Sequence, residues 1–386
     1  MELWTVSVNA DPRYSVYGAH GGGQGKFVRT IATDMVNLGW NVTTITSSSG
    51  AADSVQHHDD IPNLIDLENP STPHISDREI RYSDSLFQKL DKLIESKPPP
   101  AAILCCHALS WPLVSHIHKR TAAPIISSLC SSGREKEEGL GKVDVARRRF
   151  ENELINKSEI LIASSESEST ILKQDYQAPV DKIIEIPRPI DVEKFSPSSS
   201  MSPPFSVLFV GRPTRQKGLD TFLEAIAHIN ECDVPVTIVG CSIKDINEDS
   251  ILCRYMKNID IAKITIIPSI DHIKMPSVIR AHSVVVIPSR YETYGNIAVE
   301  AMACGIPIIA TNVGALRTHI NNSKAGYLVE PDSPQDLAHA ITKLRSRPNE
   351  QKRMGSLGRA YAQKADKRMI IQSLSQAINH KLELFR

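Results

Sequence analysis

The stretch from Ile287 to Gly305 constrains the fold of this chain more than any other part of its sequence. It begins at the end of an apolar run, Ser283–Pro288, whose composition is typical of a strand buried on both faces of a parallel sheet. A short loop follows, and then a helix-forming run that Gly305 and Pro307 end. Strand, loop and helix in this order predict an open α/β sheet. Such sheets bind ligands at the carboxyl ends of their strands, where a helix N-terminus offers N–H groups to phosphate.

Two glutamates in this stretch, Glu292 and Glu300, are separated by seven residues. The first lies in the loop and the second about one and a half turns into the helix. The spacing alone would fit two solvated glutamates of any α/β protein. However, Pro307–Thr311, Val313–Gly314 and Gly326–Val329 extend a familiar pattern over about forty positions. Together these residues resemble the Glu-x7-Glu signature of the retaining GT-B glycosyltransferases of family 4, the sucrose-phosphate-synthase-like group also called glycosyl transferases group 1.

A second motif, Gly211–Gly218, follows a strand predicted at Ser206–Gly211 and precedes a predicted helix. Its Arg212 and Lys217 resemble the family's Arg and Lys that bind the diphosphate of a nucleotide sugar. Two cations suit that role, because cleavage of the glycosidic bond places negative charge on the leaving diphosphate. A solvated basic turn is the alternative for these residues taken alone.

The resemblance also gives roles to the residues around the two glutamates. It implies that Glu300 accepts the ribose hydroxyls of the nucleotide and that Glu292 contacts the donor sugar. It places the N–H groups of Gly295, Asn296 and Ile297 against the β-phosphate, at the start of the helix. The donor-binding residues that it implies are Gly22, Gly23, Gln24, Arg212, Lys217, Glu292, Thr293, Tyr294, Gly295, Asn296, Ile297 and Glu300.

The first half of the chain begins with a strand–helix–strand pattern around a glycine-rich turn. Strands are predicted at Leu3–Val8 and Val42–Thr46, with apolar residues at helical spacing between them. The turn lacks the Gly-x-Gly-x-x-Gly fingerprint of dinucleotide-binding proteins. It instead resembles the Gly-Gly-Gln loop of the family, with Gly22, Gly23 and Gln24 in the matching places. A merely tight strand–helix turn is the alternative.

His107 is the catalytic candidate of the first half. It follows a strand predicted at Ala101–Cys106, at a strand end where members of the family often place a histidine facing the donor sugar. A histidine with structural hydrogen bonds is the alternative. The catalytic residues predicted in this way are His107, Arg212, Lys217 and Glu292, with no metal ligand and no cofactor.

Residues 196–204, rich in serine and proline, divide the chain of 386 residues. We predict a GT-B architecture of two Rossmann-like, doubly wound α/β domains facing across a cleft. The acceptor-side domain is expected at 1–195, the nucleotide-sugar-binding domain at 205–365, and a helix that crosses back to the first domain at 366–386. Residues 1–195 hold 21 Lys+Arg and 27 Asp+Glu, a formal charge of −6 that leaves +6 for the rest of the neutral chain. The second half therefore suits an anionic ligand.

Segments between the motifs carry weaker signals. Residues 50–80 are polar and poorly periodic, which predicts a surface loop, and Arg134–Glu138 is predicted as a charged loop. The last helices are predicted at 334–346 and 350–384. Pro187-Arg188-Pro189 departs from the family, which has a small polar residue and a glycine where Arg188 and Pro189 stand.

Composition and terminal sequence argue against several other classes of protein. Seven cysteines at irregular spacing do not suggest a disulfide framework, and Cys105 and Cys106 are expected to be core thiols. His57 and His58 lack the further ligands of a metal site, and no Asp-x-Asp is present. The arginines of Val145–Phe150 are followed by glutamates, which favours a solvated helix face over a lipid anchor. With no signal peptide, no membrane span and no net charge, we expect a cytoplasmic protein without stable membrane attachment or nucleic-acid partner.

These observations and the resemblance predict a retaining hexosyltransferase. It would move a sugar from a nucleotide-diphosphate donor, in the first place a UDP-sugar, to a small soluble acceptor such as a sugar, a cyclitol or a natural product. The expected mechanism is front-face and independent of metal. The alternatives are a GDP-sugar-dependent mannosyltransferase-like enzyme on a lipid or polysaccharide precursor, a GT-B epimerase, and an inactive subunit that binds nucleotide sugar. A phosphorylase would need a Schiff-base lysine for pyridoxal, and no segment has that context.

Overall fold

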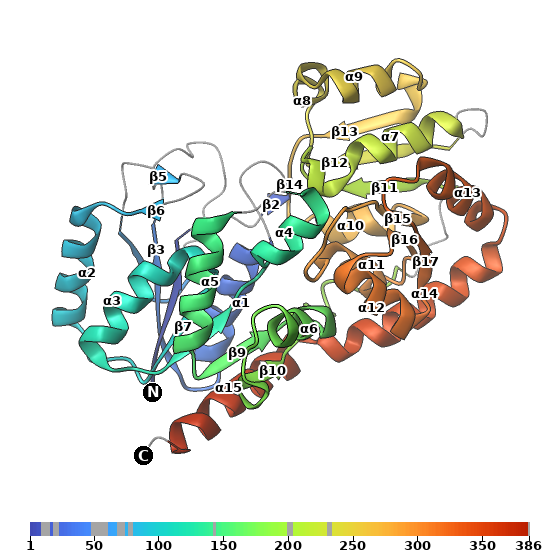
Figure 1. The fold of residues 1–386 in the computed structure, drawn as a ribbon. Helices are drawn as coiled ribbons and strands as arrows, with labels where there is room; N and C mark the ends of the chain where they lie inside the picture. The colour runs from blue at the N-terminus through green and yellow to red at the C-terminus, as the bar shows by residue number, and fades with distance from the viewer. Residues whose placement is uncertain are drawn as a thin grey trace. The chain divides into compact units, whose positions relative to one another are not determined.

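The computed structural model describes residues 1–8, 16–17, 23–47, 61–67, 74–75, 80–141, 144–198, 204–229 and 234–384. The chain forms two compact units, each with a parallel sheet and helices of its own (Figure 1). Unit 1 holds Met1–Ser15, Gly22–Pro189 and Lys367–Arg386, and unit 2 holds Val16–Gly21 and Ile190–Asp366. The two Rossmann-like α/β folds that the sequence predicts are therefore confirmed.

The sheet of unit 1 is parallel throughout its described strands, in the order β10-β9-β8-β7-β1-β3-β4. Its strands are β1 (Glu2–Ser7), β3 (Asn41–Thr46), β4 (Leu64–Asp66), β7 (Ala102–Cys106), β8 (Ile125–Ser128), β9 (Ile160–Ala163) and β10 (Ile183–Glu185). The strands predicted at Leu3–Val8, Val42–Thr46 and Ala101–Cys106 are confirmed to within one residue at each end. The strand order reverses between β1 and β7, and open α/β sheets bind their ligands at such a point.

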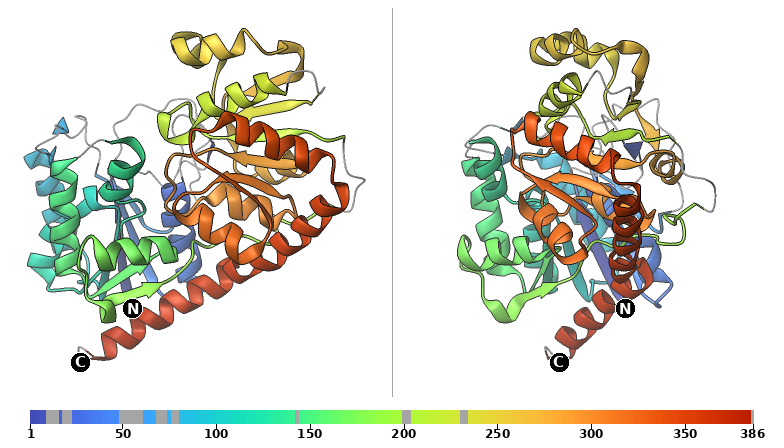
Figure 2. Two further views of the ribbon diagram at one scale, coloured as in Figure 1. Left: turned by 45° about the vertical axis from the view of Figure 1, so that its right-hand side comes forward. Right: turned by 90° about the vertical axis from the view of Figure 1, so that its right-hand side faces the viewer.

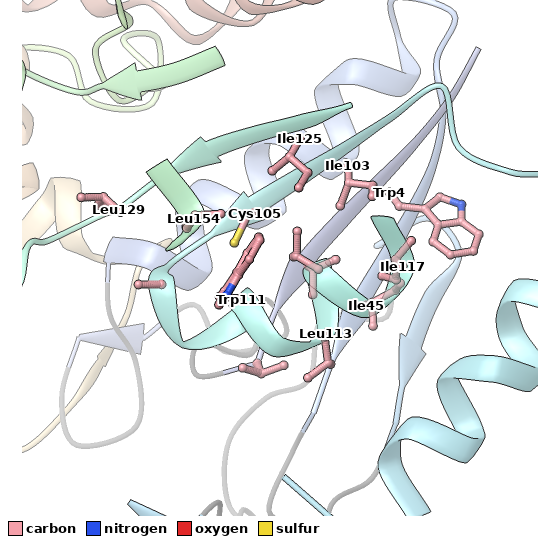
Figure 3. Packing of buried hydrophobic residues seen from close by; sticks show 14 of the residues in the cluster. Trp4, Ile45, Ile103, Cys105, Trp111, Leu113, Ile117, Ile125, Leu129 and Leu154 are labelled. Carbon is pink, nitrogen blue, oxygen red and sulfur yellow. The ribbon is translucent and has the colours of Figure 1, made fainter. Parts of the chain in front are cut away.

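Helices cover both faces of this sheet (Figure 1). One face carries α2 (Asp84–Ser96), α3 (Trp111–Thr121), α5 (Val145–Lys157) and α6 (Glu166–Gln174), and the other carries α1 (Gly23–Val36) and α15 (Lys367–Leu384). Because side chains alternate along a strand, Ile103 and Cys105 of β7 pack under the first set of helices, and Leu104 and Cys106 under the second. Figure 3 shows the first cluster, with Trp111 beside Cys105. Cys105 and Cys106 are thus buried free thiols of the core, as predicted.

The sheet of unit 2 is also parallel, in the order β13-β12-β11-β15-β16-β17. Its strands are β11 (Val207–Val210), β12 (Val236–Val239), β13 (Ile264–Ile267), β15 (Val284–Ile287), β16 (Ile308–Thr311) and β17 (Gly326–Val329). A short antiparallel pair, β2 (Val16–Tyr17) and β14 (Ile270–Asp271), lies outside the main sheet. Here the strand order reverses between β11 and β15, the two strands that precede the sequence motifs.

The helices of unit 2 again form two layers. One layer contains α7 (Leu219–His228), α8 (Ile243–Glu248), α9 (Ser250–Met256) and α13 (Pro334–Arg345), and the other contains α10 (Met275–Arg280), α11 (Asn296–Ala303) and α12 (Gly314–Ser323). Val207 and Phe209 of β11 pack against the first layer, and Leu208 and Val210 against the second. The strand, loop and helix predicted around Ile287 are confirmed as β15, a loop and α11.

The segment predicted as a charged loop, Arg134–Glu138, is helical instead. It belongs to α4 (Gly133–Leu140), which begins with a capping box. The Ser132 hydroxyl accepts a hydrogen bond from the Glu135 N–H at 3.1 Å, and the Glu135 carboxylate accepts one from the Ser132 N–H at 2.9 Å. These two bonds satisfy N–H groups at the helix start, so the helix forms in spite of its run of charges.

The helix predicted at 350–384 is two helices. The first, α14 (Pro348–Ala362), ends in the short turn Gln363–Ala365, and α15 begins at Lys367. Between them Asp366 leaves the helical conformation (φ −53°, ψ 128°) and forms a β-bridge with Ile190. This pairing interrupts the helix. The last helix, α15, which ends at the C-terminus in Figure 2, packs its apolar residues against α1 within unit 1.

Most of the loop predicted at 50–80 lies outside the described residues, as do His57 and His58. The described part contains β4 and the antiparallel pair β5 (His74–Ile75) and β6 (Ile80–Arg81). The segment is therefore not a loop throughout, because β4 extends the edge of the main sheet beside β3.

Candidate active site

The candidate site lies at the strand-order reversal of unit 2, where the loops after β11 and β15 meet. The first loop ends in the short turn η3 (Arg215–Lys217). The Arg290 N–H of the second loop donates to the Gln216 carbonyl at 2.8 Å, and the Gln216 amide donates to the Tyr291 carbonyl at 3.3 Å. Hydrogen bonds between the loops therefore hold the two sequence motifs side by side.

Lys217 and Glu292, one from each loop, form an ion pair at this point. The Lys217 Nζ lies 2.5 Å from the Glu292 Oε2, and the two side chains are 22% and 12% exposed. The Ser289 hydroxyl faces the same carboxylate oxygen at 3.4 Å. Arg212, the other predicted cation, is exposed at the start of the first loop. Two cations on one loop and a carboxylate on the next suit a ligand that carries both negative charge and hydroxyl groups.

Two glycines allow the backbone around this ion pair to pack closely. Gly218 has φ 65°, and a Cβ there would lie 2.0 Å from the Pro288 carbonyl oxygen. Gly314 has φ 42°, and a Cβ there would lie 2.2 Å from the Glu292 carbonyl oxygen. That carbonyl accepts the Ala315 N–H at 3.1 Å, at the start of α12. A side chain at either glycine would displace the loops that carry the ion pair.

The N-terminus of α11 follows the Glu292 loop directly. Gly295 precedes the helix in a left-handed conformation (φ 79°) and supplies no side-chain cap. Its carbonyl accepts the Ala298 N–H at 2.9 Å. The N–H groups of Asn296 and Ile297 belong to the first turn, whose donors have no acceptor within the helix. Such donors, together with the helix dipole, favour an anionic ligand.

Glu300 lies on the buried side of α11. Its side chain is 0% exposed, and its Oε1 lies 3.1 Å from the Nε2 of His272, which follows β14. The His272 ring packs against Phe195, with the ring centroids 5.0 Å apart. The two predicted glutamates therefore differ in their surroundings, because Glu292 pairs with a partly exposed lysine and Glu300 with a histidine in the interior.

A buried histidine of α12, His319, holds the backbone of the Glu292 loop. Its Nε2 lies 2.6 Å from the Tyr294 carbonyl, which can only accept, so Nε2 carries the proton. Its Nδ1, 3.0 Å from the Tyr361 hydroxyl, then accepts from that group. Burial, opposed in part by the hydrogen bond to Tyr294 and by the charge of Glu292, lowers the pKa of His319 to about 4. The ring is therefore neutral at neutral pH and has both partners that this tautomer requires.

In unit 1 the strand-order reversal is occupied by Gln24 and His107. The Gln24 amide, in the first turn of α1, donates to the Cys106 carbonyl at 2.7 Å and lies 3.5 Å from the Ser7 hydroxyl. Gln24 thus joins α1 to the ends of β1 and β7. Gly23 begins α1, whereas Gly22 lies outside the described residues.

His107 has an unusual backbone conformation for a residue with a side chain, with φ 106°. Its N–H donates to the Ser128 carbonyl at 2.9 Å, and its Nδ1 accepts the Leu109 N–H at 3.2 Å. Burial, together with the charges of Arg147 and Lys136, holds the pKa of His107 well below its usual range. A neutral ring that accepts at Nδ1 carries its proton on Nε2, so the second nitrogen of His107 is a donor.

The arginines of Val145–Phe150 do not share one solvated face. Arg147 is 3% exposed and pairs at 2.8 Å with Glu151, which is 0% exposed. Arg149 is 76% exposed and pairs at 2.9 Å with Glu153. Residues four apart lie on the same face of a helix, so each glutamate pairs with the arginine one turn before it. The predicted solvated face is therefore wrong for Arg147, whose side of α5 faces the core.

Comparison with protein families identifies the chain. The family model "Glycosyl transferases group 1" matches residues 191–361, and the model "Glycosyltransferase Family 4" matches residues 21–194. The matches together include the site residues of both units. The chain belongs to the family 4 glycosyltransferases.

Similar proteins agree with this assignment. The family 4 chain is 31% identical over 270 residues to a D-inositol 3-phosphate glycosyltransferase of Paenarthrobacter aurescens. The aligned region covers 65% of this chain and 63% of that protein. The match thus spans less than two thirds of the relative's length. A sucrose-phosphate synthase of Thermosynechococcus elongatus has 24% identity and a TM-score of 0.84, with 98% of each chain covered. The Anabaena HepE structure in complex with UDP and glucose has 17% identity and a TM-score of 0.75, with 98% of this chain and 99% of that chain covered. These two structures show that the fold is GT-B.

The glycosyltransferase structure brings some of the predicted residues together. Lys217 contacts Glu292, and the segment Thr293–Ile297 continues from that pair into the start of α11. The residues predicted from the sequence do not include Arg290, His272 and His319, which contact these loops or Glu300. In the part of the chain that the structure describes, no three His, Cys, Asp or Glu side chains are grouped as metal ligands would be. None of the described helices is long and apolar enough to cross a membrane.

Proposed function

We propose that this family 4 glycosyltransferase moves a hexose from a UDP-sugar to a small soluble acceptor, with retention of the anomeric configuration. One observation carries the proposal: the Lys217–Glu292 ion pair lies at the strand-order reversal of unit 2, directly before the N-terminus of α11. An ammonium and a helix N-terminus on adjoining loops suit a diphosphate. A carboxylate beside them suits the hydroxyl groups of a sugar.

In this proposal the cations act on the leaving group. Lys217 and Arg212 bind the diphosphate, on which negative charge grows as its bond to the sugar breaks. The first-turn N–H groups of Asn296 and Ile297 bind the β-phosphate. Glu292 orients the Lys217 ammonium and binds a hydroxyl of the donor sugar.

Retention follows from a front-face route. The acceptor oxygen bonds to the anomeric carbon on the side from which the diphosphate leaves, and a diphosphate oxygen takes the proton of the acceptor hydroxyl. This route needs no carboxylate nucleophile, which fits a Glu292 whose carboxylate is engaged by Lys217. His107, neutral and protonated at Nε2, would donate a hydrogen bond to a sugar hydroxyl rather than transfer a proton.

The choice of donor and acceptor is supported by similar proteins. The HepE structure contains UDP and glucose, and the name of the Paenarthrobacter relative specifies an inositol phosphate. A thermal-shift screen of UDP-, GDP- and ADP-sugars, followed by acceptor screening with the best donor, tests the proposal. A UDP-sugar should raise Tm most, and the product should keep the donor's anomeric configuration. An inverted product, or stabilisation by a GDP-sugar alone, would contradict the corresponding part of the proposal.

The proposed ribose contact of Glu300 requires UDP to reach a carboxylate that is buried against His272, and it leads to a binding prediction. Glu300→Ala should weaken UDP binding by roughly 1.5–3 kcal/mol, because a charged hydrogen-bond acceptor for the ribose hydroxyls is lost. Calorimetric titration with UDP measures the change. Glu330→Ala, at an exposed glutamate of the same unit that accepts from the Asn312 amide, is the control and should bind as the parent does. Equal UDP affinity of Glu300→Ala and the parent would contradict the ribose contact.

Metal independence is a second expected property. Lys217, Arg212 and the N-terminus of α11 supply the positive charge that a divalent cation supplies in other transferases. Transfer measured with an excess of chelator should therefore proceed at nearly the parent rate. Loss of transfer in chelator that magnesium or manganese restores would show that these groups do not suffice.

A further inference from the structure

Arg290 contacts several segments around the candidate site. It lies in the loop after β15, two residues before Glu292, and its side chain is 10% exposed. Its guanidinium binds both oxygens of Asp220, with Nη1 at 3.0 Å and Nη2 at 2.7 Å. Nη2 also lies 2.6 Å from an oxygen of Asp332, and Nη1 donates to the Arg215 carbonyl at 2.6 Å. One side chain thus joins two carboxylates and a backbone carbonyl.

These partners enclose the turn that carries Lys217. Arg215 is the first residue of η3, and Lys217 is the last. Asp220 lies in the first turn of α7, directly after η3, and Asp332 follows β17 with a left-handed backbone (φ 56°). Arg290 therefore contacts the turn at its start and just beyond its end, with the ammonium-bearing residue between the two contacts.

The charges of this cluster compensate one another. Burial alone would raise the pKa of Asp220, but the hydrogen bonds and charge of Arg290 outweigh it and leave that pKa below its usual range. Burial alone would lower the pKa of Arg290, but Asp220 and Asp332 raise it. Asp220 and Arg290 are therefore both charged. A guanidinium shared by two carboxylates has no positive charge in excess, so Arg290 is poorly suited to bind a diphosphate itself.

We propose that Arg290 is a positioning residue for the diphosphate site. It fixes η3 in the conformation that holds the Lys217 ammonium at the phosphate position before the donor arrives. A guanidinium is planar and has five donors in fixed directions, so Arg290 can make four contacts at once through its two Nη atoms. A lysine has only three donors, all on a single nitrogen. A turn that is already ordered loses little conformational freedom when the ligand binds, and this favours affinity. The inference rests on the function proposed above.

The test compares the affinities of UDP and UMP, measured by calorimetry on the full chain. Arg290→Lys keeps a positive charge but not the forked geometry. The ratio of the Kd for UDP to the Kd for UMP should rise about tenfold, because UMP lacks one phosphate of the diphosphate that Lys217 is proposed to bind. Arg317→Lys is the matched control. Arg317 is exposed on α12 and donates to Asn312, so its replacement should leave the ratio unchanged.

A second variant and a second measurement guard against misfolding. Asp332→Asn alters a carboxylate that is 58% exposed, so the fold does not depend on its burial, and the ratio should rise about threefold. Hydrogen exchange in residues 211–220 should be faster in Arg290→Lys than in the parent, and should slow when UDP is added.

The outcomes that would count against the two proposals can be told apart. An unchanged UDP-to-UMP ratio in the folded variants, or unchanged exchange in residues 211–220, would overturn the positioning role of Arg290. An unchanged ratio that arises from parallel losses for UDP and UMP would indicate a general loosening of unit 2. A parent chain that bound none of UDP, GDP and ADP would instead overturn the proposed function, and this inference with it.

Discussion

Replacing Lys217 by methionine should lower the rate of sugar transfer by about 10²–10³-fold. Methionine keeps an unbranched apolar side chain but removes the ammonium that faces the Glu292 carboxylate at 2.5 Å. In the proposed reaction this ammonium stabilises the charge of the leaving diphosphate, which is larger in the transition state than in the bound donor. The loss should therefore appear in kcat, measured as release of nucleoside diphosphate at saturating donor and acceptor, as well as in nucleotide affinity.

Two further variants separate this role from a loss of packing. Lys352→Met, at an exposed lysine of α14 in the same unit, should transfer at the parent rate. Glu292→Gln combined with Lys217→Met should lose about as much as Lys217→Met alone, because the effects of residues in contact are not additive. A folded Lys217→Met protein that transferred within about fivefold of the parent rate would contradict the assignment of Lys217 to the leaving group.

The two loops of the site could be predicted from the sequence because their signals are local. Each loop follows an apolar run typical of a buried strand, and parallel strands present their carboxyl ends at the same edge of a sheet. The contact between Lys217 and Glu292 spans 75 residues of sequence. This contact forms because β11 and β15 are neighbours in the sheet. The order of the strands in the sheet cannot be predicted from short stretches of sequence.

The side chains that support the site could not be predicted in the same way. His319 acts through the carbonyl of Tyr294, 25 residues away, and the hydroxyl of Tyr361, 42 residues away. No periodic pattern in the sequence around a single histidine indicates which distant residues will form hydrogen bonds with it. Arg290 likewise reaches Asp220 across 70 residues. Their identification requires the folded chain.

In two helices the spacing of the residues predicts the structure better than their charges do. Ser132 and Glu135 have the separation of a capping box, which predicts the helix start that the dense charge of Arg134–Glu138 obscured. Arg147 and Glu151 are four residues apart, so they share one face of α5, and that face is buried. In both helices the separation of the two residues indicates the observed structure, whereas the surrounding charges suggest a solvated segment.

Lowering the pH from 7 to 4 should remove about 3 kcal/mol of folding stability through His319 alone. The pKa of His319 is about 4 in the folded chain, against an ordinary value of 6.5. Between these two pH values the unfolded chain binds a proton that the folded chain does not. Unfolding therefore becomes more favourable as the pH falls. Above about 6.5 both states are neutral and below about 4 both are protonated, so the contribution is constant outside this window.

His319→Gln isolates the contribution, because a glutamine amide can donate to the Tyr294 carbonyl and accept from the Tyr361 hydroxyl but does not titrate. Urea unfolding at intervals between pH 7 and pH 4 should show the parent losing about 3 kcal/mol relative to this variant. Other acid-sensitive groups, such as His107, are present in both proteins and cancel in the difference. His339→Gln, at an exposed position of α13, should give a curve parallel to that of the parent. If His319→Gln were also parallel to the parent, the folded chain would protonate His319 as readily as the unfolded chain, and the neutral ring that donates to Tyr294 would be the wrong assignment.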